Sequence, residues 1–178
     1  MGKYLEVRVL RAQQSNETAV FSFFLEGNDI LKISTISRLR ADNDGLLGYQ
    51  RGEVARHVDE IVDYLDAKDG PGLFPNAIVL AMSTSCQFMQ SRGPKVGDGK
   101  ADAGVLRIPV ATREEDKAAW IVDGQQRTLA LAKAKNRGLM VPVTAFVSDD
   151  FEVHRSQFLL VNKVKPLPRG LINELLPA

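Results

Sequence analysis

Cysteine and histidine are scarce in this sequence, and their scarcity excludes several kinds of site. The single thiol, Cys86, cannot form an internal disulfide, which fits a reducing cytoplasm. One cysteine and two separated histidines, His57 and His154, give no zinc-ligand spacing. We interpret residues 82–88 as the continuation of a strand, and we expect Cys86 to be a buried, inert thiol rather than a nucleophile.

Long apolar runs are also missing. No segment has the length and composition of a transmembrane helix or of a secretory signal peptide. Glu6 stands where N-myristoylation needs Ser or Thr. We therefore predict a cytoplasmic protein without a membrane partner. The sequence also has no Walker-type phosphate loop, no GxGxxG turn and no evident nucleophile–histidine–acid set.

Charge is nearly balanced overall but unevenly distributed. The formal net charge of +1 gives no global signal for a polyanionic partner. Residues 53–69 contain six acidic side chains against two basic ones, whereas residues 123–137 and 151–170 each contain one acid against four bases. The basic segments are compatible with a polyanion site, and the alternative is an ordinary solvated helix face.

The pattern of apolar residues predicts one mixed α/β domain over residues 1–178. A chain of this length can bury a sizeable single core. The order is a hairpin, a helix, strands, a helix, a strand and two helices, and we expect the strand 141–147 to lie beside the strand 118–122. The expected strands are 4–10, 19–25, 77–82, 104–110, 118–122 and 141–147, and the expected helices are 53–66, 125–136, 149–161 and 168–176, with residues 29–34 left ambiguous.

The segment Trp120–Leu131 is the most informative part of the chain. An apolar run stops at Asp123, turn-forming and amide residues follow, and a helical pattern then begins. This pattern predicts a strand, a tight turn and a helix N-terminus, where Arg127 and free backbone N–H groups suit a phosphate. The alternative is structural, with Asp123 in a turn or helix cap and Arg127 paired to a surface carboxylate.

The sequence Asp123–Arg127 resembles the signature of the DGQHR/DGQQR proteins, which are similar to the ParB/sulfiredoxin-like superfamily. Gln126 replaces the histidine of the DGQHR form. The resemblance is closest to DGQHR proteins encoded beside DNA-modification systems, namely the phosphorothioation-linked DndB group and the deazaguanine-linked DpdB group. Further matching segments, in the expected order, are Ile36–Arg40, Gly48–Arg51, Leu73–Ile78 and Phe158–Leu167.

The resemblance implies a single ParB-like domain with a mixed sheet and flanking helices, either a short member or a fragment lacking a C-terminal region. It implies a nucleotide-binding component of a bacterial DNA-modification or phage-defence system, with ATP as the expected nucleotide. Hydrolysis and a Mg²⁺ ion at Asp123 are left open. The first alternative is a non-enzymatic DNA-binding transcriptional regulator, and the second is the ParB-like nuclease subunit of a modification-dependent restriction system. DNA and other proteins of the system are the expected partners, and a homo-oligomer is left open.

The resemblance also points to a set of site residues. The candidate catalytic residues are Asp123, Gln126 and Arg127. We expect the segments around Arg51 and Arg127 to converge, and the end of the helix 149–161 to close the same pocket. The candidate nucleotide-binding residues are Gln50, Arg51, Gly124, Gln125, Arg127, Thr128, Asn162, Lys163 and Lys165.

Each of these assignments has a structural alternative. Arg51 has acids of the following helix as alternative partners, and Lys163 and Lys165 have the negative end of a helix dipole. We interpret His57 as a packing residue, Asn76 as a turn residue and Trp120 as core, while His154 shows no sign of a partner.

Overall fold

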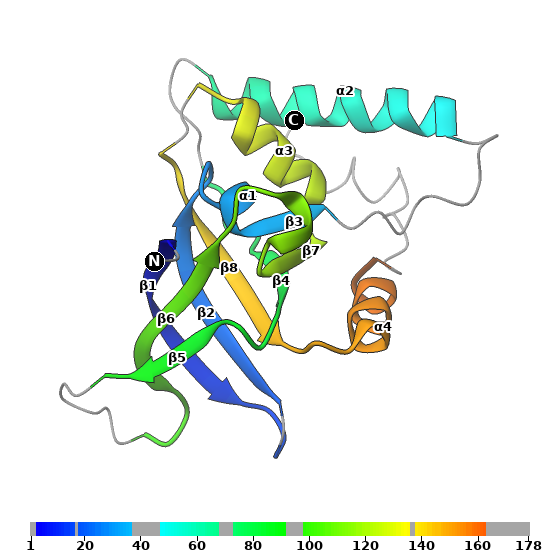
Figure 1. Ribbon diagram of the computed structural model, residues 1–178. Helices are drawn as coiled ribbons and strands as arrows, with labels where there is room; N and C mark the ends of the chain where they lie inside the picture. The colour runs from blue at the N-terminus through cyan, green and yellow to red at the C-terminus, as the bar shows by residue number, and fades with distance from the viewer. Residues whose placement is uncertain are drawn as a thin grey trace, which may run out of the picture.

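The structure, a computed structural model, describes residues 3–16, 18–36, 47–67, 73–91, 98–135 and 138–162, with side chains left out at 47–54 and 162. Figure 1 shows a curled sheet with helices at one end and a further helix at its side. The strands are β1 (Lys3–Gln13), β2 (Ala19–Glu26), β3 (Ser34–Ile36), β4 (Ile78–Met82), β5 (Gln87–Gln90), β6 (Asp102–Val110), β7 (Ala119–Asp123) and β8 (Met140–Val147). The helices are α1 (Ile30–Ile33), α2 (Leu47–Leu65), the 3-10 turn η1 (Glu114–Asp116), α3 (Gln125–Lys133) and α4 (Phe151–Asn162).

All of these strands belong to one mixed sheet, in the order β3-β7-β4-β8-β2-β1-β6-β5. The pairs β3–β7 and β4–β8 are parallel, and the other neighbouring pairs are antiparallel. The predicted mixed α/β class is therefore confirmed, and so is the hairpin between β1 and β2. Alternation explains the hairpin, because Phe21, Phe23 and Leu25 are buried while the residues between them are exposed.

The predicted position of β8 is wrong. It does not lie beside β7, because β4 is inserted between them and pairs with both. Ile78, Leu80, Ala81 and Met82 are fully buried, as a central strand requires. The order of strands along the chain gave no sign of this insertion.

The segment around Cys86 was also predicted wrongly as a strand continuation. β4 ends at Met82, and a turn follows in which the N–H of Cys86 donates to the carbonyl of Ser83 at 3.1 Å. Hydroxyl-bearing residues favour such turns. The thiol itself is buried as expected, and burial raises the pKa of Cys86 to about 11.

The helices differ from the prediction mainly in their ends. α2 begins at Leu47 rather than Glu53, and α3 ends at Lys133 rather than residue 136. α4 begins as expected, because a carboxylate oxygen of Asp150 accepts the N–H of Glu152 at 2.8 Å. The predicted helix 168–176 lies outside the described residues. Within the described part of the chain, none of the helices has the length and hydrophobicity needed to cross a membrane.

Helix α2 lies alongside α3 at one end of the sheet (Figure 1). Two contacts support this pairing. Lys133 on α3 lies 3.6 Å from Asp59 on α2, and the backbone N–H of Lys135 donates to Asp66 at 2.8 Å. These contacts hold the C-terminal end of α3 against α2.

Candidate functional site: the cleft at the DGQQR loop

The loop between β7 and α3 turns at Gly124, which has φ 88° and ψ 20°. Residues with a side chain rarely adopt this left-handed conformation. A Cβ added at Gly124 would also lie 2.5 Å from Cδ1 of Ile78. Glycine is thus required here, and its missing side chain leaves the first turn of α3 without a side-chain cap.

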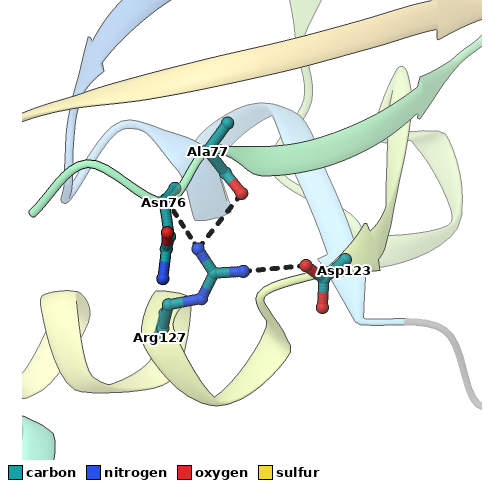
Figure 2. A network of polar contacts seen from close by, with 4 residues as sticks. All are labelled: Asn76, Ala77, Asp123 and Arg127. Atoms are coloured by element: carbon teal, nitrogen blue, oxygen red, sulfur yellow. Dashed lines mark hydrogen bonds and ion pairs between the residues drawn. The ribbon is translucent and has the colours of Figure 1, made fainter. Parts of the chain in front are cut away.

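Arg127 is held by three contacts within the molecule (Figure 2). Its Nη1 donates to the carbonyls of Asn76 at 2.6 Å and Ala77 at 3.1 Å, and its Nη2 donates to Oδ2 of Asp123 at 2.8 Å. The guanidinium therefore joins the segment before β4 to the end of β7 and to α3. Asp123 and Arg127 are four residues apart, so one turn of chain brings their charges together.

This geometry changes the interpretation of Arg127. Carbonyls and a carboxylate of the same chain occupy three of the five N–H donors of its guanidinium, so the expected phosphate contact of Arg127 stays a prediction. The structure is closer to the alternative in which Arg127 pairs with a carboxylate, although that carboxylate is Asp123 of the motif itself. The side chain remains 20% exposed and lines the adjoining cleft, so its remaining donors lie beside that space.

The motif forms part of the wall of a cleft of about 680 Å³. Three other parts of the chain complete the cleft: helix α2, the segment before β4, and helix α4. The residues that line it are His57, Glu60, Ile61, Tyr64, Phe74, Asn76, Val122, Asp123, Gly124, Gln125, Gln126, Arg127, Leu129 and Phe158.

The other motif residues divide between the cleft and the core. Gln126 lines the cleft and is half-buried. Gln125 also lines it, and its side-chain amide donates to the carbonyl of Ile121 at 3.4 Å. Thr128 is fully buried and does not line the cleft, and its hydroxyl has no partner among the described residues. The prediction that Thr128 contacts a nucleotide is therefore corrected, because the helix turns this residue into the core.

The remaining predicted site residues cannot be placed at the cleft. Gln50 and Arg51 lie inside α2 rather than before it, and their side chains are not among those described. The side chain of Asn162, the last residue of α4, and all of Lys163 and Lys165 also lie outside the described residues. Convergence of these residues with Arg127 therefore stays a prediction.

Helix α2 contributes cleft residues that sequence reasoning missed. His57 was expected to pack, but its side chain is 58% exposed and its Nδ1 lies 3.1 Å from Oε2 of Glu60. Both residues line the cleft, as do Ile61 and Tyr64. Their spacing of three, four and seven residues marks one helix face, and this was the available signal.

Tyr64 fixes the chain that leads into β4. Its hydroxyl donates to the carbonyl of Leu73 at 2.9 Å and accepts the N–H of the same residue at 2.8 Å. The following residues, Phe74 and Asn76, line the cleft. Asn76 was expected to be a turn residue, but the structure assigns no turn at residues 73–77, and its carbonyl accepts a hydrogen bond from Arg127.

A smaller cavity of about 120 Å³ lies beside α4 and shares Val122 and Phe158 with the cleft. His154 lines this cavity and is buried. It has partners in the structure, although the sequence gave no sign of one. Its Nε2 lies 2.7 Å from the carbonyl of Ser148, and its ring centroid lies 5.0 Å from that of Trp120. These contacts seat α4 on β7.

A metal site is not evident from the protein side chains alone. Among the described residues, no three His, Cys, Asp or Glu side chains gather as a metal would require. Asp123 presents one carboxylate oxygen to Arg127, and the structure gives its other oxygen no partner within the described chain. A Mg²⁺ ion that arrives with a nucleotide needs only one or two protein carboxylates, so Asp123 fits that use.

These features define a class of protein: a mixed α/β domain that presents a DGQQR loop to a cleft between helices. The family model of DndB, described as DNA-sulfur modification-associated, matches residues 7–173. The chain therefore belongs to the DndB family. Comparison with curated proteins and with solved structures gave no match. The ParB-like form of the fold accordingly stays a prediction, whereas the mixed α/β architecture is established.

Proposed function

We propose that this DndB-family protein binds a nucleoside triphosphate in the cleft, as a component of a DNA phosphorothioate modification system. Membership of the DndB family supports this context over a deazaguanine system. One observation carries the nucleotide proposal. The uncapped first turn of α3, at residues 125–127, forms part of the wall of a cleft with the volume of a typical small-molecule site.

The phosphates are assigned to the motif end of the cleft. Backbone N–H groups at a helix N-terminus carry partial positive charge and favour anions. Gly124 has no side chain that would obstruct their approach. Arg127 acts chiefly by holding the loop in place, and its remaining donors add positive charge nearby. A nucleotide-borne Mg²⁺ would use the free oxygen of Asp123 and neutralise charge on the phosphates.

Hydrolysis is a separate step of the proposal. Phosphoryl transfer to water needs a group that orients the water, and an amide side chain can do this. Gln126 is the cleft residue of the motif whose side-chain amide is given no protein partner within the described chain. We assign it this role, with Asp123 and Arg127 as its catalytic neighbours. Release of inorganic phosphate from ATP, measured with and without DNA, tests the assignment.

Nucleotide binding itself is tested with Gln126→Glu and with a matched control, Gln87→Glu, at an exposed position of strand β5. A negative charge in the first turn of α3 stabilises the helix but repels phosphate. We expect ATP affinity, measured by calorimetry, to fall at least about tenfold in Gln126→Glu, while its thermal stability stays the same or rises. Gln87→Glu should bind normally. Equal binding by both variants would remove the phosphates from this loop.

A DNA-binding regulator is the second candidate, supported by the family's association with DNA modification. It predicts binding that weakens steeply with salt and no turnover of nucleotide. The described surface favours it less, because many basic side chains are already matched with acids. Lysines and arginines that lie in ion pairs are Lys32, Arg107, Arg113, Lys117, Arg127, Lys133 and Arg155.

A further inference from the structure

We propose that Glu60, oriented by His57, binds the ribose hydroxyls of the nucleotide, so that the cleft selects ribonucleotides over deoxyribonucleotides. This inference rests on the proposed nucleotide function and adds the substrate class. Its starting point is that Glu60 lines the same cleft as the DGQQR loop but comes from a different element, α2.

The charges of the cleft are divided between its walls. Asp123 is matched by Arg127, so the motif wall is left with the positive end of α3. On the α2 wall, Glu60 supplies a carboxylate with a 64% exposed side chain. A ligand that fits both walls must be anionic at one end and must offer hydrogen-bond donors at the other. A nucleoside triphosphate has this polarity, whereas a DNA strand carries phosphates along its length.

The contact with His57 fixes how Glu60 is presented. Oε2 of Glu60 lies 3.1 Å from Nδ1 of His57, and the structure gives Oε1 no partner among the described residues. A carboxylate is an acceptor-only group, and its hydrogen bonds to hydroxyls are stronger than those between neutral groups. Adjacent ribose hydroxyls provide two donors at suitable spacing. Carboxylates recognise the ribose 2′-hydroxyl in the same way in dinucleotide-binding folds.

Aromatic and aliphatic side chains supply the rest of a nucleoside site. Phe74 and Phe158 line the cleft and are half-buried, and Ile61 and Leu129 add apolar surface. Bases stack on aromatic rings with little dependence on sequence. The cleft therefore provides a stacking surface for the base, an acceptor for the sugar and a helix terminus for the phosphates.

The test compares the four ribonucleoside triphosphates with their 2′-deoxy counterparts by calorimetry, using the full chain. We expect the preferred ribonucleotide to bind about tenfold more tightly than its deoxy form, because one charge-assisted hydrogen bond is lost. Glu60→Gln should abolish this preference and weaken deoxynucleotide binding less than ribonucleotide binding, because the deoxy form offers only the 3′-hydroxyl. Asp63→Asn is the matched control, since Asp63 is exposed on the same helix and does not line the cleft.

His57 is a positioning residue in this proposal, and the ratio of ribonucleotide to deoxynucleotide affinity reports on it. His57→Ala should lower the ratio, and His57→Gln, whose amide can still donate to Glu60, should retain it. Equal binding of both nucleotide forms by the unmodified protein, or a preference that survives Glu60→Gln, would overturn the ribose assignment alone. Failure of every nucleotide to bind would overturn the proposed function, and this inference with it.

Discussion

Arg127 donates more hydrogen bonds to backbone carbonyls than to a charged side chain. Two of its three contacts go to the carbonyls of Asn76 and Ala77, which precede it by 51 and 50 residues in the sequence. The pairing with Asp123 was readable from the spacing of four residues, but the carbonyl contacts were not. They depend on β4 lying beside β7, which no local pattern encodes.

We predict that Arg127→Ala lowers the free energy of unfolding by about 1–3 kcal/mol, because two carbonyls and a carboxylate lose their donor in a largely buried place. Arg127→Lys should recover only part of this loss, since an ammonium lacks the planar fork that reaches all three acceptors. Urea unfolding measures both variants.

The control for Arg127 is Arg155→Ala, which removes an exposed arginine 3.8 Å from Glu152. We expect this change to alter stability by less than about 0.5 kcal/mol. If Arg127→Ala matched the control in stability and lost only nucleotide binding, the phosphate-binding role expected from sequence would be the better description.

Among the elements, periodicity predicted most strands well and the helix ends poorly. Strands with buried residues at alternate positions, such as β2, carry their own signal. α2 begins six residues before the first residue of its predicted range, because helices extend where flanking residues tolerate helical geometry. The cleft-lining face of α2 was available in the spacing of His57, Glu60 and Tyr64. The sequence could not show that this face lines a cleft, because that depends on where α3 packs.

The connection from β8 to α4 is held by a carboxylate. Asp149 accepts hydrogen bonds from both the side-chain hydroxyl and the backbone N–H of Thr84, in the turn after β4. These two bonds, the hydroxyl first, hold the pKa of Asp149 below its ordinary value of 3.8. The contact links two loops that are distant in sequence and thereby helps to seat α4.

This lowered pKa predicts an acid-dependent contribution to stability. Since the folded pKa is below the unfolded one, Asp149 stabilises the fold above pH 3.8, and that contribution is lost as the pH falls through the folded pKa. Asp149→Asn should be less stable than the unmodified protein at about pH 7, and the difference should shrink at lower pH. Urea unfolding over this range measures it. A difference that is constant with pH would show that the carboxylate charge is not involved.

At the scale of the whole molecule, the sheet joins segments that are far apart in the sequence. β3 and β5 form its two edges, and the pairs between them draw on segments from residue 3 to residue 147. Order along the sequence predicted the class but not this strand order, because each strand could pair with several others. A continuous sheet and one shared core favour a single cooperative unit.

We therefore predict that the two edges of the sheet unfold together. Trp120, the only tryptophan, reports on β7 near one edge. A second probe, Phe88→Trp in a Trp120→Phe background, reports on β5, where Phe88 lies half-buried with its ring centroid 5.8 Å from that of Phe21. Each protein is unfolded in urea and followed by fluorescence and by far-ultraviolet circular dichroism. The two signals should give one midpoint within each protein, because a single domain loses both edges in one transition. In either protein, a fluorescence midpoint well separated from that of the circular dichroism would divide the chain into two units and contradict the single domain predicted from its sequence.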